Sequence, residues 1–193
     1  RQKRRETASF TPVSATSALL ISNISQEVTR QSFLALTGYE REYRNFTTFY
    51  GLTRELAHVL WPRMLHPLVG KGDIEACCKT REQREAWDRF VERPIGEAVE
   101  AYFAHDFVRG LVFTDAKIGV ATHAYDETGL QNRCFAYHII GNETGEWQVP
   151  VKGMGQVTDA LRDCAQKHGA HILTSCDVIG VDTDGSEAMT TFS

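Results

Sequence analysis

Two glycines, Gly153 and Gly155, stand between a short extended segment and an amphipathic helical pattern in the stretch WQVPVKGMGQVTDAL. A glycine-rich turn between a strand and a helix can hold the phosphates of a dinucleotide, because its backbone N–H groups approach them closely. That fingerprint needs a third glycine, and Thr158 occupies its position here. Pro150 also interrupts the preceding segment, which a central parallel strand rarely tolerates. The glycine pair is therefore not predicted to be the primary phosphate loop.

The other residues with reactive side chains are scattered. His168 and His171 flank Gly169, so one ends a helix and the other begins a strand, whereas metal ligands must share a face. No metal site is predicted. His138, in the apolar run AYHII, is either satisfied within the core or acts from a pocket, and Asp115 either bonds locally or faces a pocket. No nucleophile motif is present, and the catalytic residues stay unassigned.

An aromatic row is the strongest side-chain pattern in the first half of the chain. Its members fall at i, i+4, i+7 and i+11, on one face of a helix: Tyr39, Tyr43, Phe46 and Tyr50. Packing into a core is the more frequent role of such a row, because aromatic side chains stabilise strongly when buried. The alternative is that the four residues bind a hydrophobic substrate as one wall of an apolar pocket.

The elements that position these residues are mainly helical up to residue 135. The first twelve residues are polar and basic and are expected to form a loose arm. Ser25 and Gly38 bracket one helix, and the aromatic row belongs to a longer one that ends at Trp61-Pro62. Thr80 caps a helix that runs to Glu92, and further helices follow Pro94 and cover Phe107 to Phe113.

The rest of the chain changes character. CFAYHIIG and WQVPVK look extended, GQVTDALRDCAQKHG has a helical pattern, and the stretch from Ile172 onward is β-rich with a turn at TDGS. The predicted fold class is α+β. Its parts are a flexible arm at 1–12, a helical substrate-cavity region at 13–135 and a partial β/α/β segment at 136–193.

Composition excludes several partner classes. The net charge of −4 and pI near 6.0 give no basic footprint for nucleic acid. Five cysteines without a CxxC pair indicate reduced thiols in a cytoplasmic compartment. The longest early apolar run, ALLI, is far too short to span a bilayer. The chain lacks a starting Met and ends in a strand-like stretch, as an excised piece of a longer protein would.

Two stretches carry a resemblance to a known family. WQVPVKGMGQVTDALRDCAQKHGAHILTSCDVIGVDTD resembles a segment of the FAD-dependent amine-oxidase and phytoene-desaturase-type oxidoreductases. FAHDFVRGLVFTDAKIG, followed by YHIIG, is similar to the phytoene dehydrogenase-related branch. The resemblance covers about Pro94 to Asp184, and Lys152 departs from it at the first glycine of the family's glycine pair.

The resemblance implies a piece of a flavoprotein. At the position matching Val178 the family uses backbone groups to bind the FAD adenine, although an ordinary strand valine is the alternative here. The family's phosphate-binding loop lies in N-terminal sequence that this chain does not contain. The intact protein would then remove hydride from a hydrophobic substrate. The competing hypothesis is a non-enzymatic helical module that binds a lipid, a membrane surface or a protein.

Overall fold

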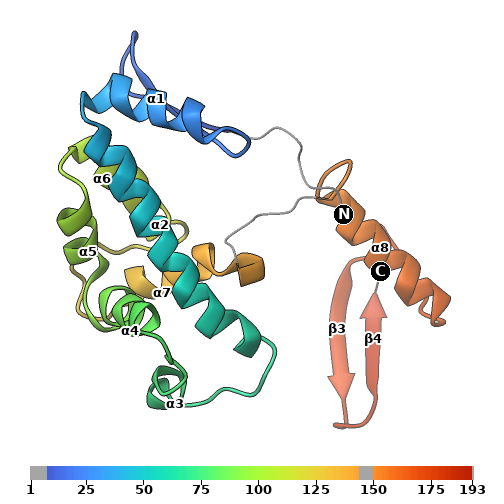
Figure 1. Ribbon diagram of the computed structural model, residues 1–193. Helices are drawn as coiled ribbons and strands as arrows, with labels where there is room; N and C mark the ends of the chain where they lie inside the picture. The colour runs from blue at the N-terminus through green and yellow to red at the C-terminus, as the bar shows by residue number, and fades with distance from the viewer. Residues whose placement is uncertain (1–7, 144–149, 193) are drawn as a thin grey trace. The chain divides into compact units, whose positions relative to one another are not determined.

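The computed structural model describes residues 8–143 and 150–192, which belong to two compact units (Figure 1). The unit within residues 8–143 contains a two-stranded hairpin followed by helices, and it holds the hydrophobic core. The unit within residues 150–192 contains one helix and a second hairpin. Both sheets are antiparallel and two-stranded, so the predicted α+β class is confirmed.

The first unit opens with a hairpin covered by a helix. Strands β1 (Ala8–Pro12) and β2 (Ala18–Ser22) pair, and α1 (Gln26–Thr37) lies against β2. The amide of Leu20 donates to Ser32 Oγ on α1, and Leu19 is fully buried. The expectation of a loose arm over 1–12 is therefore wrong for residues 8–12, because β2 pairs with their backbone. Residues 1–7 lie outside the described part of the chain.

Helix boundaries in this unit follow the predicted signals. Ser25 Oγ accepts a hydrogen bond from the amide of Val28 at the start of α1. Gly38 ends α1 with a φ of 74°, a left-handed conformation that glycine adopts without steric cost. Thr80 and Gln83 form a capping box at the start of the fourth helix.

Helix α2 is the central element of the unit and contacts α1, α4, α5 and α7. It spans Glu40–Leu60 and passes into a 3-10 turn, η1 (Trp61–Arg63), where Pro62 cannot supply an amide for further helical hydrogen bonds. Phe49 of α2 is fully buried and meets Phe90 and Phe135 edge-on, with ring centroids 5.2 Å and 6.0 Å away. Each such side chain stabilises the fold by about 1.5–3 kcal/mol when buried.

The remaining helices of the unit follow α2 in the sequence. The predicted helix from Thr80 to Glu92 exists, but its second half is a π-helix. The remaining helices and helical turns of the unit are α3 (Lys71–Glu75), α4 (Arg81–Trp87), the π-helix η2 (Asp88–Glu92), α5 (Ile95–Tyr102), α6 (Asp106–Thr114), α7 (Leu130–Ile139) and the 3-10 turn η3 (Gly141–Glu143).

Helix α7 corrects one expectation, because CFAYHIIG was predicted to be extended. Its buried residues Cys134, Phe135, His138 and Ile139 recur at the spacing of one helical face, and the core accepts that face. A short apolar run does not distinguish a buried strand from a buried helix by periodicity alone. The boundary expected at residue 135 falls inside α7.

The second unit consists of α8 (Gly155–Lys167) and a hairpin of β3 (Val178–Thr183) and β4 (Ala188–Phe192). The predicted turn between the strands is present, and Asp184 Oδ1 accepts hydrogen bonds from the amides of Ser186 and Glu187. The strand expected from Ile172 begins only at Val178. None of residues 150–192 is buried, so the described part of this unit has no core of its own.

Among residues 8–143 and 150–192, no helix combines the length and the apolar character that crossing a bilayer requires.

Candidate functional site

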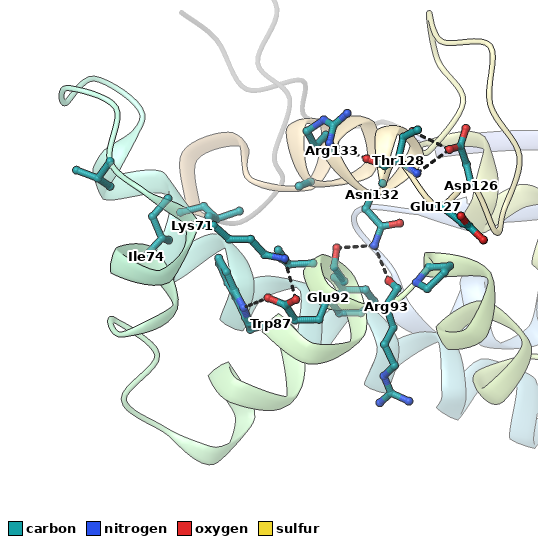
Figure 2. Close-up of a pocket in the computed structure, with 17 residues that line it drawn as sticks. Lys71, Ile74, Trp87, Glu92, Arg93, Asp126, Glu127, Thr128, Asn132 and Arg133 are labelled. Atoms are coloured by element: carbon teal, nitrogen blue, oxygen red, sulfur yellow. Dashed lines mark hydrogen bonds and ion pairs between the residues drawn. The ribbon is translucent and has the colours of Figure 1, made fainter.

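Two cavities in the helical unit are large enough for a small molecule. The first, of about 520 Å³, opens beside the π-helix, and we call it the π-turn cavity. Its walls include Ile74, Trp87, Phe90, Glu92, Asn132 and Arg133 (Figure 2). The second, of about 700 Å³, lies where α2 ends against the end of α7, and we call it the Trp61 cavity. Its walls include Trp61, Met64, Leu65, Tyr137, His138 and Ile140.

A hydrogen-bonded network of three side chains forms one side of the π-turn cavity. Lys71 Nζ lies 2.7 Å from Glu92 Oε2, and Trp87 Nε1 donates to Glu92 Oε1 at 2.9 Å. Figure 2 shows the three side chains pointing toward one another. The hydrogen bond from Lys71, and then that from Trp87, lower the pKa of the Glu92 carboxyl. Glu92 is therefore an anion whose two oxygens are already engaged.

Asn132 holds the π-helix in place from α7. Its Nδ2 donates to the backbone oxygens of Phe90 and Arg93, at 2.9 Å and 2.7 Å, and its Oδ1 accepts from the amide of Ile95 at 3.1 Å. A π-turn disturbs the regular i→i−4 pattern, so these main-chain groups need other partners. The buried amide of Asn132 provides them and joins η2, α5 and α7 at one point.

The turn before α7 and the start of α7 contribute further polar residues to the π-turn cavity. Asp126 Oδ1 accepts hydrogen bonds from the amide and the hydroxyl of Thr128, which lower the pKa of the Asp126 carboxyl. Arg133 Nη1 donates to the backbone oxygen of Thr128 at 2.9 Å. With Lys71 and Glu92, these groups give the cavity charges of both signs. Its ionic groups are largely paired within the protein.

The Trp61 cavity has different walls. It is enclosed by η1 and the residues after it on one side, and by the end of α7 with Gly141 on the other. None of its lining residues is Asp, Glu, Lys or Arg, and its polar side chains are His66, Tyr137 and His138. The cavity is therefore mainly apolar with a few hydrogen-bonding groups, which is the usual composition of a small-molecule site.

His138 is the buried polar residue of the Trp61 cavity. Its Nδ1 lies 2.8 Å from the backbone oxygen of Cys134, one helical turn earlier. A carbonyl oxygen can only accept, so Nδ1 carries a proton. The ring of Tyr137 stands perpendicular to it, with centroids 5.5 Å apart. Sequence reasoning left His138 open between core and pocket, and the structure places it in both.

Asp115 interacts electrostatically with His138 and with two other ionisable groups, Cys134 and Tyr50. Burial raises the pKa of the Asp115 carboxyl, and the nearby imidazole of His138 partly offsets this. Burial also raises the pKa of the Cys134 thiol, which donates to the backbone oxygens of Asp115 and Ile118. The pKa of Tyr50 is raised by burial and then by the charge of Asp115. Asp115 and the other two groups all lie outside the set of residues that line either cavity.

The predicted aromatic row packs against the core. Phe46 lies between Phe33 and Tyr50, with centroids 4.9 Å and 4.7 Å away, and Tyr43 is 6.0 Å from Phe33. Tyr39 stands apart at the N-cap of α2 and is 69% exposed. None of the four residues lines either of the two cavities. Their role in substrate binding stays a prediction.

The predicted cofactor-side residues lie in the second unit. Val178 begins β3, pairs with Phe192 and is 63% exposed. Gly153 has a φ of 95°, and Lys152 has a φ of 71°, so the lysine retains the left-handed backbone that a glycine would favour. His168 caps the C-terminus of α8, and both His168 and His171 are exposed. Among residues 8–143 and 150–192, no cluster of three or more metal-ligand side chains occurs.

Sequence reasoning missed both cavities. The available signal for the Trp61 cavity was the loop WPRMLHPLVG, which combines prolines with five large apolar residues. Apolar side chains in a loop need burial that the loop itself cannot provide. The π-turn cavity had no comparable signal, because the sequence around it reads as an ordinary capped helix.

Similar proteins cover most of the chain. Proteins of Mycobacterium tuberculosis and Mycobacterium bovis, described as uncharacterized, are 38% identical over 192 residues, which is 96% of this chain and 36% of each relative. The chain thus spans about a third of the length of these relatives. A rat protein, pyridine nucleotide-disulfide oxidoreductase domain-containing protein 2, is 29% identical over 94 residues, 47% of this chain and 16% of that protein. No family model and no solved structure matches.

Proposed function

We propose that the chain is the substrate-side part of an FAD-dependent oxidoreductase, a dehydrogenase or desaturase, that acts on a hydrophobic molecule. The observation that carries this proposal is the similarity of about half of the chain to an oxidoreductase domain-containing protein. The resemblance of the segment from Pro94 to Asp184 to flavin-dependent oxidoreductases points to the same class of reaction. The chemistry of the Trp61 cavity supports a hydrophobic substrate.

The residues present are compatible with one edge of an FAD site. An adenine offers a donor and an acceptor at its edge, which the N–H and C=O of an extended strand can meet. Val178 lies at the start of β3 and is 63% exposed. The bound flavin would supply the hydride acceptor.

The helical unit would contribute the enclosure for the substrate. Trp61, Met64 and Ile140 give the Trp61 cavity apolar walls, and the buried side chain of His138 also lines it. Flavin dehydrogenation places few demands on acids and bases, because the cofactor takes the hydride and the protein mainly orients the substrate. An apolar cavity with a single buried imidazole suits that task.

The test is the flavin content of the protein expressed from its complete gene. We expect a visible flavin absorption band, and FAD should be released on denaturation. Val178→Ala should keep the bound FAD, because it retains the backbone groups, while Val178→Pro should lose most of it, because proline lacks an N–H. Circular dichroism checks that both variants are folded. A colourless protein would contradict the proposal.

A second candidate is a non-enzymatic module that binds a lipid, a membrane surface or a protein. It is favoured by the loop between η1 and α3, where Leu65 is 99% exposed and Leu68 is fully exposed. Exposed apolar side chains that gather on one loop can contribute to a contact site. This candidate predicts binding of the protein to phospholipid vesicles, its loss in the double variant Leu65→Ser with Leu68→Ser, and no flavin in the full-length protein.

A further inference from the structure

Cys78 anchors an otherwise superficial part of the helical unit. Within residues 60–85, all of which the structure describes, it is the only buried residue, with 6% of its surface exposed. This segment contains η1, the loop after it and α3, and it supplies walls to both cavities. A region with few buried apolar contacts opens locally at a low cost in free energy. A change that draws Cys78 out of the core would therefore loosen one wall of each cavity.

A second cysteine directly precedes Cys78. Cys77 is half-buried just after α3, and its Sγ donates a hydrogen bond to the backbone oxygen of Asp73 at 3.3 Å. Burial raises the pKa of the Cys78 thiol, which favours its protonated and less reactive form. The two thiols thus differ in access, because a small oxidant can reach Cys77 while Cys78 is sheltered. The other cysteines have no cysteine beside them in the sequence: Cys134, Cys164 and Cys176.

Adjacent cysteines can form a disulfide without bringing distant segments together. Their Cα atoms are about 3.8 Å apart across a trans peptide, whereas ordinary disulfides join Cα atoms about 4.4–6.8 Å apart. The peptide between Cys77 and Cys78 must therefore twist, and the Cys78 side chain must turn from its buried position toward Cys77. A strained disulfide of this kind is readily reduced again, as in regulatory rather than structural disulfides.

We propose that Cys77 and Cys78 form a redox modification site, which a hydroperoxide converts into a vicinal disulfide that frees α3 and the loop before it. With hydrogen peroxide, the thiolate of Cys77 attacks one oxygen, the O–O bond breaks, and a sulfenic acid and one water form. The sulfur of Cys78 then attacks the sulfur of Cys77, so the S–S bond forms, the S–O bond breaks and a second water leaves. The two thiols are oxidised by two electrons, and the peroxide is reduced to two waters.

The disulfide would remove two interactions that hold α3. Sγ of Cys77 no longer carries a proton to donate to the backbone oxygen of Asp73, and Cys78 loses its place in the core. Helix α3 carries Lys71, whose Nζ lies 2.7 Å from Glu92 Oε2. Loosening of α3 would therefore also weaken this ion pair at the edge of the π-turn cavity. The site does not depend on a flavin, so it goes beyond the proposed function.

The experiment treats the reduced full-length protein with a small excess of hydrogen peroxide, alkylates the remaining thiols and digests the protein with trypsin. Cleavage after Lys71 and Lys79 leaves both cysteines in one peptide, GDIEACCK. We expect this peptide to escape alkylation and to lose the mass of two hydrogen atoms, and dithiothreitol should restore two alkylated cysteines. A peptide that is still doubly alkylated after peroxide, or one that is cross-linked to another cysteine, would overturn the proposal.

Three variants assign the roles, and circular dichroism checks that each is folded. Cys78→Ala leaves Cys77 without its partner, so peroxide should give a sulfenic acid that dimedone traps, and no disulfide. Cys77→Ser should leave Cys78 reduced, and oxidation of Cys78 at the original rate in this variant would contradict attack at Cys77. Cys164→Ser removes an exposed thiol from the second unit and is the matched control. It should form the disulfide in GDIEACCK to the same extent as the original protein.

Limited trypsin digestion under native conditions tests the release of α3. Cleavage after Lys71 should become several-fold faster in the oxidised protein and return to its original rate after reduction, because a protease cuts the locally opened chain. Cleavage after Arg162, in the exposed helix α8, should not change and serves as the internal reference. An oxidised protein that is cut after Lys71 no faster than the reduced one would overturn the link between the two cysteines and the cavity walls.

Discussion

Trp87 and Glu92 are five residues apart, yet Nε1 of the indole and Oε1 of the carboxylate are 2.9 Å apart. Positions five apart on an α-helix point away from each other. The pair can meet because Asp88–Glu92 is a π-helix, in which the amide of Arg93 donates to the backbone oxygen of Asp88. The π-turn thus brings Glu92 to both Trp87 and Lys71 at the edge of the cavity.

Glu92→Gln should destabilise the protein at neutral pH by up to about 1 kcal/mol, because the ion pair with Lys71 is partly exposed and screened by solvent. The folded-state pKa of Glu92 lies below the ordinary value of 4.5, so this stabilisation is present above that value. It is lost as the pH falls through the folded-state pKa. Urea unfolding across this range should therefore show the two proteins converging in acid.

The matched control is Glu127→Gln, which removes an exposed carboxyl from the same cavity without breaking a described hydrogen bond or ion pair. Its stability should track the original protein at every pH. A difference between Glu92→Gln and the original protein that stays constant as the pH is lowered would contradict the assigned role of the Glu92 charge.

Asn132→Ala should cost about 2–4 kcal/mol, because it leaves two backbone oxygens and the amide of Ile95 without their partner in a buried region. Asn132→Asp keeps the acceptor for Ile95 and loses both donors, so it should also destabilise the protein. Chemical denaturation measures both values. Loss of less than 1 kcal/mol in Asn132→Ala would mean that η2 does not depend on α7.

Gly96→Ala tests the close approach between α5 and the loop before α7. A Cβ at Gly96 would lie 2.8 Å from Tyr125 Cζ and 2.9 Å from the backbone oxygen of Ala124, and the amide of Gly96 already donates to that oxygen. We expect a cost of about 1–3 kcal/mol from overpacking.

Gly51→Ala on α2 is the control for Gly96→Ala. Apart from the neighbouring backbone of its own helix, no atom in the described part of the chain lies within 4 Å of its added Cβ, so it should stabilise the helix by about 0.5–1 kcal/mol. Thermal unfolding should shift in opposite directions for the two variants. An increase in the unfolding temperature of both variants would show that helix propensity outweighs the contact with Tyr125.

Local signals in the sequence predicted most of the helical unit. Ser25, Gly38, Thr80 and Pro62 fix helix ends through interactions within one turn, so their effect is readable without the fold. The π-turn was not predictable, because Asp88–Glu92 reads as a continuation of α4. The π-turn is accompanied by hydrogen bonds from Asn132, which lies some forty residues later in the sequence.

The candidate site was harder to predict than the fold. The row of Tyr39, Tyr43, Phe46 and Tyr50 was recognised, but periodicity does not indicate whether a face meets other helices or a ligand. The Trp61 cavity arises where a loop meets the end of α7, so its residues come from distant segments. The apolar stripe of α8 was also recognised, yet no residue of α8 is buried within the described unit.

Phe46→Ala should distinguish the two interpretations of the aromatic row. Phe46 packs between Phe33 and Tyr50, and removing its ring should cost about 2–3 kcal/mol, somewhat below the value for a fully buried phenylalanine. Tyr39→Ala, at a largely exposed N-cap position, should change the stability by no more than about 0.5 kcal/mol. Denaturant unfolding gives the readout. Unchanged stability of Phe46→Ala would contradict core packing and favour a pocket wall; we expect a loss of stability, because the ring already has protein partners.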